Sequence, residues 1–150
     1  MAQSLSNVLL HIVFSTKNRQ NWIQPDIESE LYRYLAATCR SFDCPAIQIG
    51  GTKNHVHILC RMARTITISK LVEKVKTGSS KWIKTKRTDF SKFSWQNGYG
   101  AFSIGVSNLN ALKKYIANQE EHHKHRSFRD EFRELLQKYQ IKYDERYLWD

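Results

Sequence analysis

Two histidines in the apolar segment NHVHILC, His55 and His57, constrain the fold of this chain more than any other feature. Successive side chains of a β-strand point to opposite faces, so residues two apart share a face. The segment therefore predicts a strand that buries Val56 and Ile58 on one side and presents both histidines on the other. Two neighbouring imidazoles can hold one divalent cation, although many paired strand histidines ligate nothing.

The three cysteines, Cys39, Cys44 and Cys60, fit neither a disulfide framework nor a zinc spacing. Cys60 has the strand parity of Val56, so it should face away from the histidines. No apolar run approaches the roughly 20 residues of a membrane span, and the N-terminal charge pattern is the reverse of a secretion signal. We therefore expect reduced, structural cysteines in a cytoplasmic protein without a membrane partner.

Basic residues are concentrated in the middle of the chain. Residues 53–92 contain eleven basic and two acidic side chains, and so carry nine of the ten excess positive charges. Such a patch suggests a polyanionic partner, because Lys and Arg displace counterions condensed on a phosphate backbone. The alternative is a basic surface that serves solubility only. The candidate phosphate contacts are Lys76, Lys81, Lys84, Lys86 and Arg87, with Phe93 or Trp95 as candidate stacking partners for unpaired bases.

The remaining patterns predict a single α+β domain spanning residues 1–150. Its antiparallel sheet carries the helices on one face, in an arrangement related to the ferredoxin-like fold. Apolar periodicity and turn residues place strands at residues 5–15, 46–49, 55–61 and 99–106, and helices at residues 25–43, 67–86, 107–125 and 127–139. Ser107 and Ser127 are the expected N-caps of the last two helices. The sequence Gly78-Ser79-Ser80 is a weak point in the second helix.

Tyr115 and Gln119 are four residues apart on the third predicted helix, so they project from one face. A carboxamide oxygen can ligate Mg²⁺ or Mn²⁺, and a phenol beside a polarised phosphate can act as a nucleophile. Without further information, a tyrosine at the edge of an apolar stripe is more often a packing residue. These two positions alone do not define a site.

Other candidates have simpler explanations. His122, His123 and His125 follow two glutamates at a helix end, which favours solvated side chains, although His122 shares a face with Tyr115. Tyr99, between two glycines, is a rival nucleophile, but a strand-edge aromatic in the core is the simpler interpretation.

The chain resembles the single-tyrosine transposases of the HUH superfamily, of the insertion sequence 200/605 type that includes relatives associated with repeated extragenic palindromes. Five segments carry the resemblance in order along nearly the whole chain: HIVFSTKNR, NHVHILC, ISKLVEKVKTGSSKWI, WQNGYGAFSIG and YIANQEEHH. The resemblance implies the HUH endonuclease form of the antiparallel sheet. The departures are Asn18, where an aromatic residue is common, and the tail DERYLWD, which has no assigned role.

The resemblance implies a metal-dependent enzyme. The ligands of a Mg²⁺ or Mn²⁺ ion would be His55, His57 and Gln119, and Tyr115 would attack the DNA. The implied reaction cleaves and rejoins single-stranded DNA at hairpin-bearing ends through a 5′-phosphotyrosine intermediate. The resemblance further implies a homodimer with active sites shared between subunits, and a bacterial or archaeal protein associated with DNA.

The sequence is also compatible with two other functions. One is a domesticated, non-catalytic module that binds palindromic DNA or RNA. The presence of all four implied site residues argues against it. The other is a small metal-binding protein without a nucleic-acid role, which the basic middle of the chain disfavours.

Overall fold

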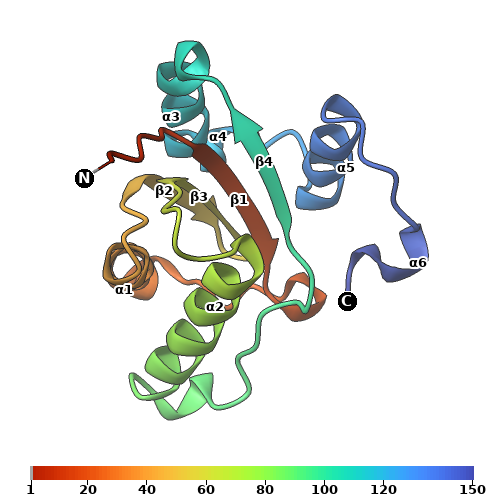
Figure 1. Ribbon diagram of the computed structural model, residues 1–150. Coiled ribbons are helices and arrows are strands. Elements are labelled where there is room, and N and C mark those ends of the chain that lie inside the picture. The colour runs from red at the N-terminus through yellow and green to blue at the C-terminus, as the bar shows by residue number, and fades with distance from the viewer. Residues whose placement is uncertain (1) are drawn as a thin grey trace.

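A computed structural model describes residues 2–150 as a four-stranded sheet with helices on both sides (Figure 1). The strands are β1 (Leu9–Ser15), β2 (Ala46–Thr52), β3 (His55–Arg61) and β4 (Gly100–Ile104). The helices are α1 (Pro25–Ser41), α2 (Ile68–Lys84), α3 (Leu109–Ala117), α4 (Gln119–His122), α5 (Phe128–Lys138) and α6 (Glu145–Leu148). No helix among the described residues is both long and apolar enough to cross a membrane.

Neighbouring strands are antiparallel throughout, in the order β2-β3-β1-β4. The chain order β1-α1-β2-β3-α2-β4 is the βαββαβ pattern of ferredoxin-like folds, which confirms the predicted α+β class. The two central strands, β1 and β3, are buried almost completely. In their register Val13 is opposite His57, and Ser15 is opposite His55.

One face of the sheet packs against α1 and α2 to form the main core. Alternate residues of the two central strands point to this face, where they meet the apolar stripes of both helices. These strand residues are Leu10, Ile12, Phe14, Val56, Ile58 and Cys60. The three free cysteines are all buried on this side. The predicted strand parity is therefore confirmed.

The opposite face carries the histidines and is covered by α3, α4 and α5. A smaller apolar cluster joins α5 to this face, and its members are Val13, Phe102, Phe128, Phe132 and Leu136. The prediction of helices on one face was incomplete: α1 and α2 occupy one face, and the helices after β4 occupy the other (Figure 1). The physical reason is that β1 and β4 also place apolar side chains, Val13 and Phe102, on the histidine face, and these must be covered.

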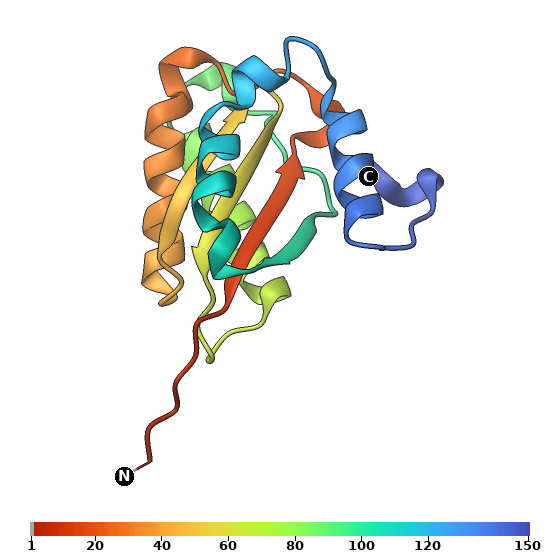
Figure 2. The same cartoon turned by 90° about the horizontal axis from the view of Figure 1, so that it is seen from above.

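Strand and helix ends differ from the predictions by a few residues. The first strand begins at Leu9 rather than residue 5, and residues 2–7 extend away from the sheet (Figure 2). The second strand continues past residue 49 to Thr52, because it stays paired with β3. The predicted helix at residues 107–125 is divided into α3 and α4 by Asn118, whose φ is −103° and ψ is 26°.

Of the two predicted N-caps, one is confirmed. The Ser127 hydroxyl accepts a hydrogen bond from the backbone N–H of Asp130 at 3.2 Å and caps α5. Ser107 lies within a 3-10 turn, and the residue that precedes α3 is Asn108, which makes no side-chain cap bond.

Phe93 and Trp95 belong to the core, so their predicted role as stacking partners for bases is wrong. Their side chains are 1% and 6% exposed and pack edge-to-face against each other. The Trp95 indole N–H donates to the Ser79 hydroxyl at 2.9 Å, and Ser79 donates to the Val75 carbonyl at 2.7 Å. α2 runs without interruption through the Gly78-Ser79-Ser80 segment.

The C-terminal segment folds back on the domain beside α5 (Figure 2). Trp149 packs near Phe132, with the guanidinium groups of Arg19 and Arg129 at 5.4 and 4.9 Å from its ring centre. The Asp150 carbonyl accepts from the backbone N–H of Asn97 at 2.8 Å. The tail therefore ties α5 to the loop that precedes β4.

The glycine at position 50 sets how closely α3 approaches the sheet. Gly50 lies opposite His57 in the register of β2 and β3. A Cβ atom at this position would lie 2.2 Å from the backbone carbonyl oxygen of Ile116, the residue after Tyr115. The contact therefore sets the distance between α3, which carries Tyr115, and the face of the sheet that carries the histidines.

We expect Gly50→Ala to lower the free energy of unfolding by about 1–3 kcal/mol, because the added methyl group forces α3 away from β2. Urea denaturation followed by circular dichroism measures this change. Gly105→Ala is the matched control, since a Cβ there would meet no atom closer than the Ser107 hydroxyl oxygen at 3.8 Å. Equal stability of the two variants would show that α3 is not seated against Gly50.

Candidate active site

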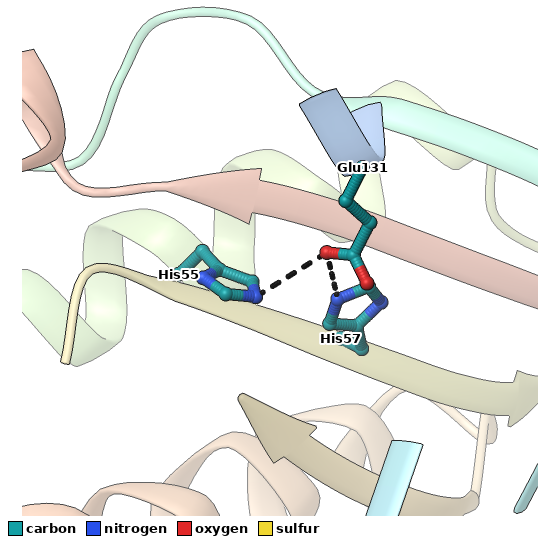
Figure 3. A group of neighbouring side chains, drawn as sticks. All are labelled: His55, His57 and Glu131. Carbon is teal, nitrogen blue, oxygen red and sulfur yellow. Dashed lines mark hydrogen bonds and ion pairs between the residues drawn. The ribbon is translucent and has the colours of Figure 1, made fainter. Parts of the chain in front are cut away.

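Beneath α3, α4 and α5, the sheet carries a buried cluster of polar side chains. Its members His55 and His57 come from β3, Gln119 begins α4, and Glu131 belongs to α5; each is at most 1% exposed. In Figure 3 the two imidazoles and the Glu131 carboxylate point toward one another. One ligand atom from each of these three lies within 4.8 Å of the others. Elements far apart in the sequence thus converge on one small volume.

The distances around the histidines are short. His55 Nε2 lies 2.8 Å from Gln119 Oε1, and His57 Nε2 lies 3.0 Å from Glu131 Oε1. The Gln119 amide N–H donates to Glu131 Oε2 at 2.9 Å. A carboxylate oxygen only accepts hydrogen bonds, so this contact turns the Gln119 carbonyl oxygen toward His55. The three residues predicted as ligands are therefore brought together.

The far side of each imidazole is held by neighbouring strand residues. His57 Nδ1 lies 2.8 Å from Nε2 of His11, a buried residue of β1 whose ring stacks on it with centroids 5.0 Å apart. His55 Nδ1 lies 2.8 Å from Asn54 Oδ1 and 3.1 Å from the Thr52 hydroxyl oxygen. These contacts fix both rings with Nε2 facing the cluster.

Burial decides the charge of these groups. Burial, followed by repulsion from His57, lowers the pKa of His55 to about 3, so this imidazole is neutral near pH 7 and free to bind a cation. Burial opposes ionisation of Glu131, but hydrogen bonds with His123 and His57 outweigh it and lower the pKa of this carboxyl group. Burial, with the nearby Glu131 charge, raises the pKa of Tyr115, which is a neutral phenol in this environment.

Tyr115 stands at the edge of the cluster. Its hydroxyl donates to Glu131 Oε2, and the Arg126 guanidinium donates to the Tyr115 oxygen at 3.1 Å. Its ring packs on His122, with the two centroids 4.7 Å apart, in agreement with the shared face predicted for this pair. Although the helix breaks at Asn118, Tyr115 and Gln119 both reach the same carboxylate.

A cleft of about 780 Å³ opens onto this edge between β4, α3 and α5. Its lining includes His11, Tyr115, Arg126 and Glu131, so the tyrosine borders the opening. The polar cluster itself lies behind this opening.

Sequence reasoning missed four residues of the site: His11, His123, Arg126 and Glu131. His123 was expected to be solvated, which is wrong, because its Nε2 lies 3.0 Å from Gln119 Oε1 and 3.1 Å from Glu131 Oε1. Its spacing of four from Gln119 was an available signal. Glu131 was also detectable, as an acidic residue within the apolar stripe of α5.

The predicted phosphate contacts lie on and after α2, which packs on the other face of the sheet. The Lys76 ammonium donates to the backbone carbonyls of residues 96, 97 and 98 at 2.8, 3.2 and 2.7 Å and so holds the turn before β4. Lys86 and Arg87 form ion pairs with acidic residues of α1. Lys81 and Lys84 line a second cleft, of about 520 Å³.

Tyr99 also lines the second cleft, with its ring centre 5.6 Å from the Lys76 ammonium. Its side chain is 37% exposed rather than part of the core. The structure therefore does not bring this rival nucleophile into the histidine cluster.

Comparisons with known proteins agree with this architecture. Residues 4–119 match the sequence model of the family described as "Transposase IS200 like". A structure from Deinococcus radiodurans R1, described as a candidate transposase, is similar with a TM-score of 0.62 and 16% identity over 79% of this chain and 98% of that one. A REP-associated tyrosine transposase bound to a REP hairpin gives a TM-score of 0.61 and 12% identity over 82% of this chain and 72% of that one. No curated protein has a matching sequence.

At these identities the two structures establish the shared fold, and the family match carries the assignment. That match runs from before β1 to Gln119, well over half of the 150 residues, and includes both histidines and Tyr115. The chain belongs to the IS200-like transposase family.

Proposed function

We propose that this protein is a metal-dependent DNA transposase that cleaves and rejoins single strands through a 5′-phosphotyrosine intermediate. The observation that carries the proposal is the meeting of Tyr115, Gln119 and the two strand histidines in one chain. Their convergence beside an open cleft is the arrangement that attack on a DNA phosphate requires.

The donor set fits Mg²⁺ or Mn²⁺. His55 Nδ1 lies 2.8 Å from Asn54 Oδ1, which only accepts hydrogen bonds, and this contact favours the tautomer with its proton on Nδ1. In that tautomer the Nε2 lone pair faces the carbonyl oxygen of Gln119 at 2.8 Å. Two such atoms approach favourably when they ligate the same cation. His57 adds a second nitrogen donor. A bound ion would polarise the scissile phosphate and neutralise the charge that develops on it.

The residues of the chain account for the remaining steps. The Tyr115 oxygen attacks phosphorus as its proton passes to Glu131 Oε2, which already accepts its hydrogen bond. The bond from phosphorus to the DNA 3′-oxygen breaks, and that oxygen takes up the proton and leaves as a 3′-hydroxyl. Arg126, 3.1 Å from the tyrosine oxygen, can offset negative charge on the attacking group and the phosphate. A second DNA 3′-hydroxyl then attacks the phosphotyrosine and releases Tyr115. The sequence of bonds formed and broken consumes no water.

We further propose hairpin-bearing single-stranded DNA as the substrate. The supporting observations are the positive excess of residues 53–92 and the hairpin named with one structural neighbour. Lys81 and Lys84, which line the second cleft, are the first candidates for backbone contacts. Lys76, Lys86 and Arg87 stay candidates, although each already has a partner within the fold. A domesticated, non-catalytic palindrome-binding module remains the alternative function.

We propose that Tyr115 serves the histidines of its own chain, and contacts within one chain support this. Its hydroxyl already contacts Glu131, which in turn lies 3.0 Å from His57. A homodimer remains a prediction, and the shared sites that the sequence resemblance implies are the alternative to this proposal. Shared sites would require α3 to be exchanged between subunits.

Tyr115→Phe should eliminate the covalent protein–DNA adduct and leave hairpin binding unchanged, because it removes only the attacking oxygen. End-labelled, hairpin-bearing single strands incubated with Mn²⁺ or Mg²⁺ and run on a denaturing gel measure the adduct. Tyr99→Phe is the matched control and should form the adduct at the wild-type level. An adduct that persists in Tyr115→Phe would refute the assignment of the nucleophile.

Replacing Lys81 and Lys84 together by glutamine should flatten the salt dependence of hairpin binding. Counterion release contributes roughly 0.7 to the log–log slope for each phosphate neutralised on a single strand, so the slope should fall by about 1.4. Fluorescence anisotropy at several salt concentrations measures it. The matched control replaces two exposed arginines of α1, Arg33 and Arg40, by glutamine. Equal slopes for the two double variants would place the DNA elsewhere.

A further inference from the structure

Glu131 is the most unusual residue of the polar cluster. It lies in α5, beyond Gln119, where the family match ends. Its side chain is fully buried, between Phe128 and Phe132 in the sequence, and both of these pack against the sheet. A buried carboxylate is costly unless hydrogen bonds or cations compensate it, so its position calls for a specific set of partners.

One carboxylate oxygen, Oε1, lies among three imidazoles. It is 3.0 Å from His57 Nε2, 3.1 Å from His123 Nε2 and 3.5 Å from His55 Nε2. Ligand atoms at right angles on a cation, with bonds of about 2.1 Å, are themselves about 3 Å apart. The separations between Glu131 and the two strand histidines are therefore those of neighbouring ligands around one ion.

The second oxygen, Oε2, has different partners. It accepts hydrogen bonds from the Gln119 amide at 2.9 Å and from the Tyr115 hydroxyl. The first of these contacts turns the Gln119 carbonyl toward His55. The carboxylate thus has one oxygen toward the strand histidines and the other toward the groups that surround the nucleophile.

We propose that Glu131 is a further ligand of the catalytic cation and supplies the negative charge that the neutral His55 and Gln119 ligands lack. Carboxylates are the preferred protein ligands of hard cations such as Mg²⁺ and Mn²⁺, which supports this choice. The inference rests on the metal dependence in the proposed function. It extends the site past the matched residues into α5.

The opposite role for Glu131 is an obstruction that occupies the place of the ion. The two roles give opposite results when the charge is removed. Loss of a ligand weakens metal binding, whereas loss of an obstruction strengthens it. The direction of the change in affinity therefore decides between them.

The test is the affinity of the full chain for Mn²⁺, measured by isothermal titration calorimetry without DNA. Glu131→Gln should weaken binding by about tenfold or more, since even loss of a group that only supports a ligand costs roughly 10–100-fold. Glu73→Gln is the matched control, because it makes the same change at an exposed position of α2, on the other face of the sheet, and should bind like wild type. Wild-type or tighter binding by Glu131→Gln would overturn the proposal.

Circular dichroism of each variant checks the fold. If Glu131→Gln does not fold, Glu131→Asp retains the charge but withdraws it by one methylene, and it should also bind Mn²⁺ more weakly than wild type; unchanged affinity would overturn the proposal. Failure of the proposed function is distinguishable, because it appears as an absent DNA adduct or as a wild-type chain that binds no Mn²⁺. Unchanged binding in the Glu131 variants refutes only the role of Glu131.

Discussion

The alternation of side chains along β3 is the constraint on which the rest of the structure depends. Val56 and Ile58 complete the core against α1 and α2, which forces His55 and His57 onto the other face. Both faces of β3 are buried in this structure, so the histidines need polar partners in place of water. The helices after β4 cover the histidines, and they bring Gln119, His123 and Glu131 as partners.

In the polar cluster, the free-energy cost of removing polar groups from water is opposed by the hydrogen bonds among them. The groups lose hydration when α5 closes over them, and the hydrogen bonds among them offset that loss only while every member is in place. Gly50 allows α3 to lie close to the sheet, and the apolar contacts of Phe128 and Phe132 hold α5 against the same face. Packing therefore sets the geometry of the site, and the cleft at Tyr115 leaves one edge of it open.

Local patterns predicted a large part of this arrangement. The bounds of β3, the burial of Cys60 and the cap at Ser127 follow from strand parity and capping chemistry within a few residues, and the structure confirms them. The convergence of His55, His57 and Gln119 was expected from the family resemblance. Tyr115 and Gln119 meet at Glu131 even though α3 ends between them.

The remaining features depend on tertiary contacts that periodicity does not encode. His11 supports His57 across 46 residues of sequence, and Glu131 reaches the same histidine across 74. Trp95 lies in a polar segment, and its burial depends on tertiary contacts with Phe14 and Ser79 as well as on its packing against Phe93. The second covered face of the sheet was missed for the same reason, since an apolar stripe predicts burial but not the partner.

The central claim, a complete active site in one chain, is tested most directly by mixing two inactive variants. His57→Ala removes a ligand and Tyr115→Phe removes the nucleophile, so each chain alone should form no adduct. After the two are unfolded and refolded together, the mixture should stay inactive, whether the protein is a monomer or a dimer. Recovery of the covalent DNA adduct would contradict this claim, because only a site shared between subunits can join intact His57 to intact Tyr115.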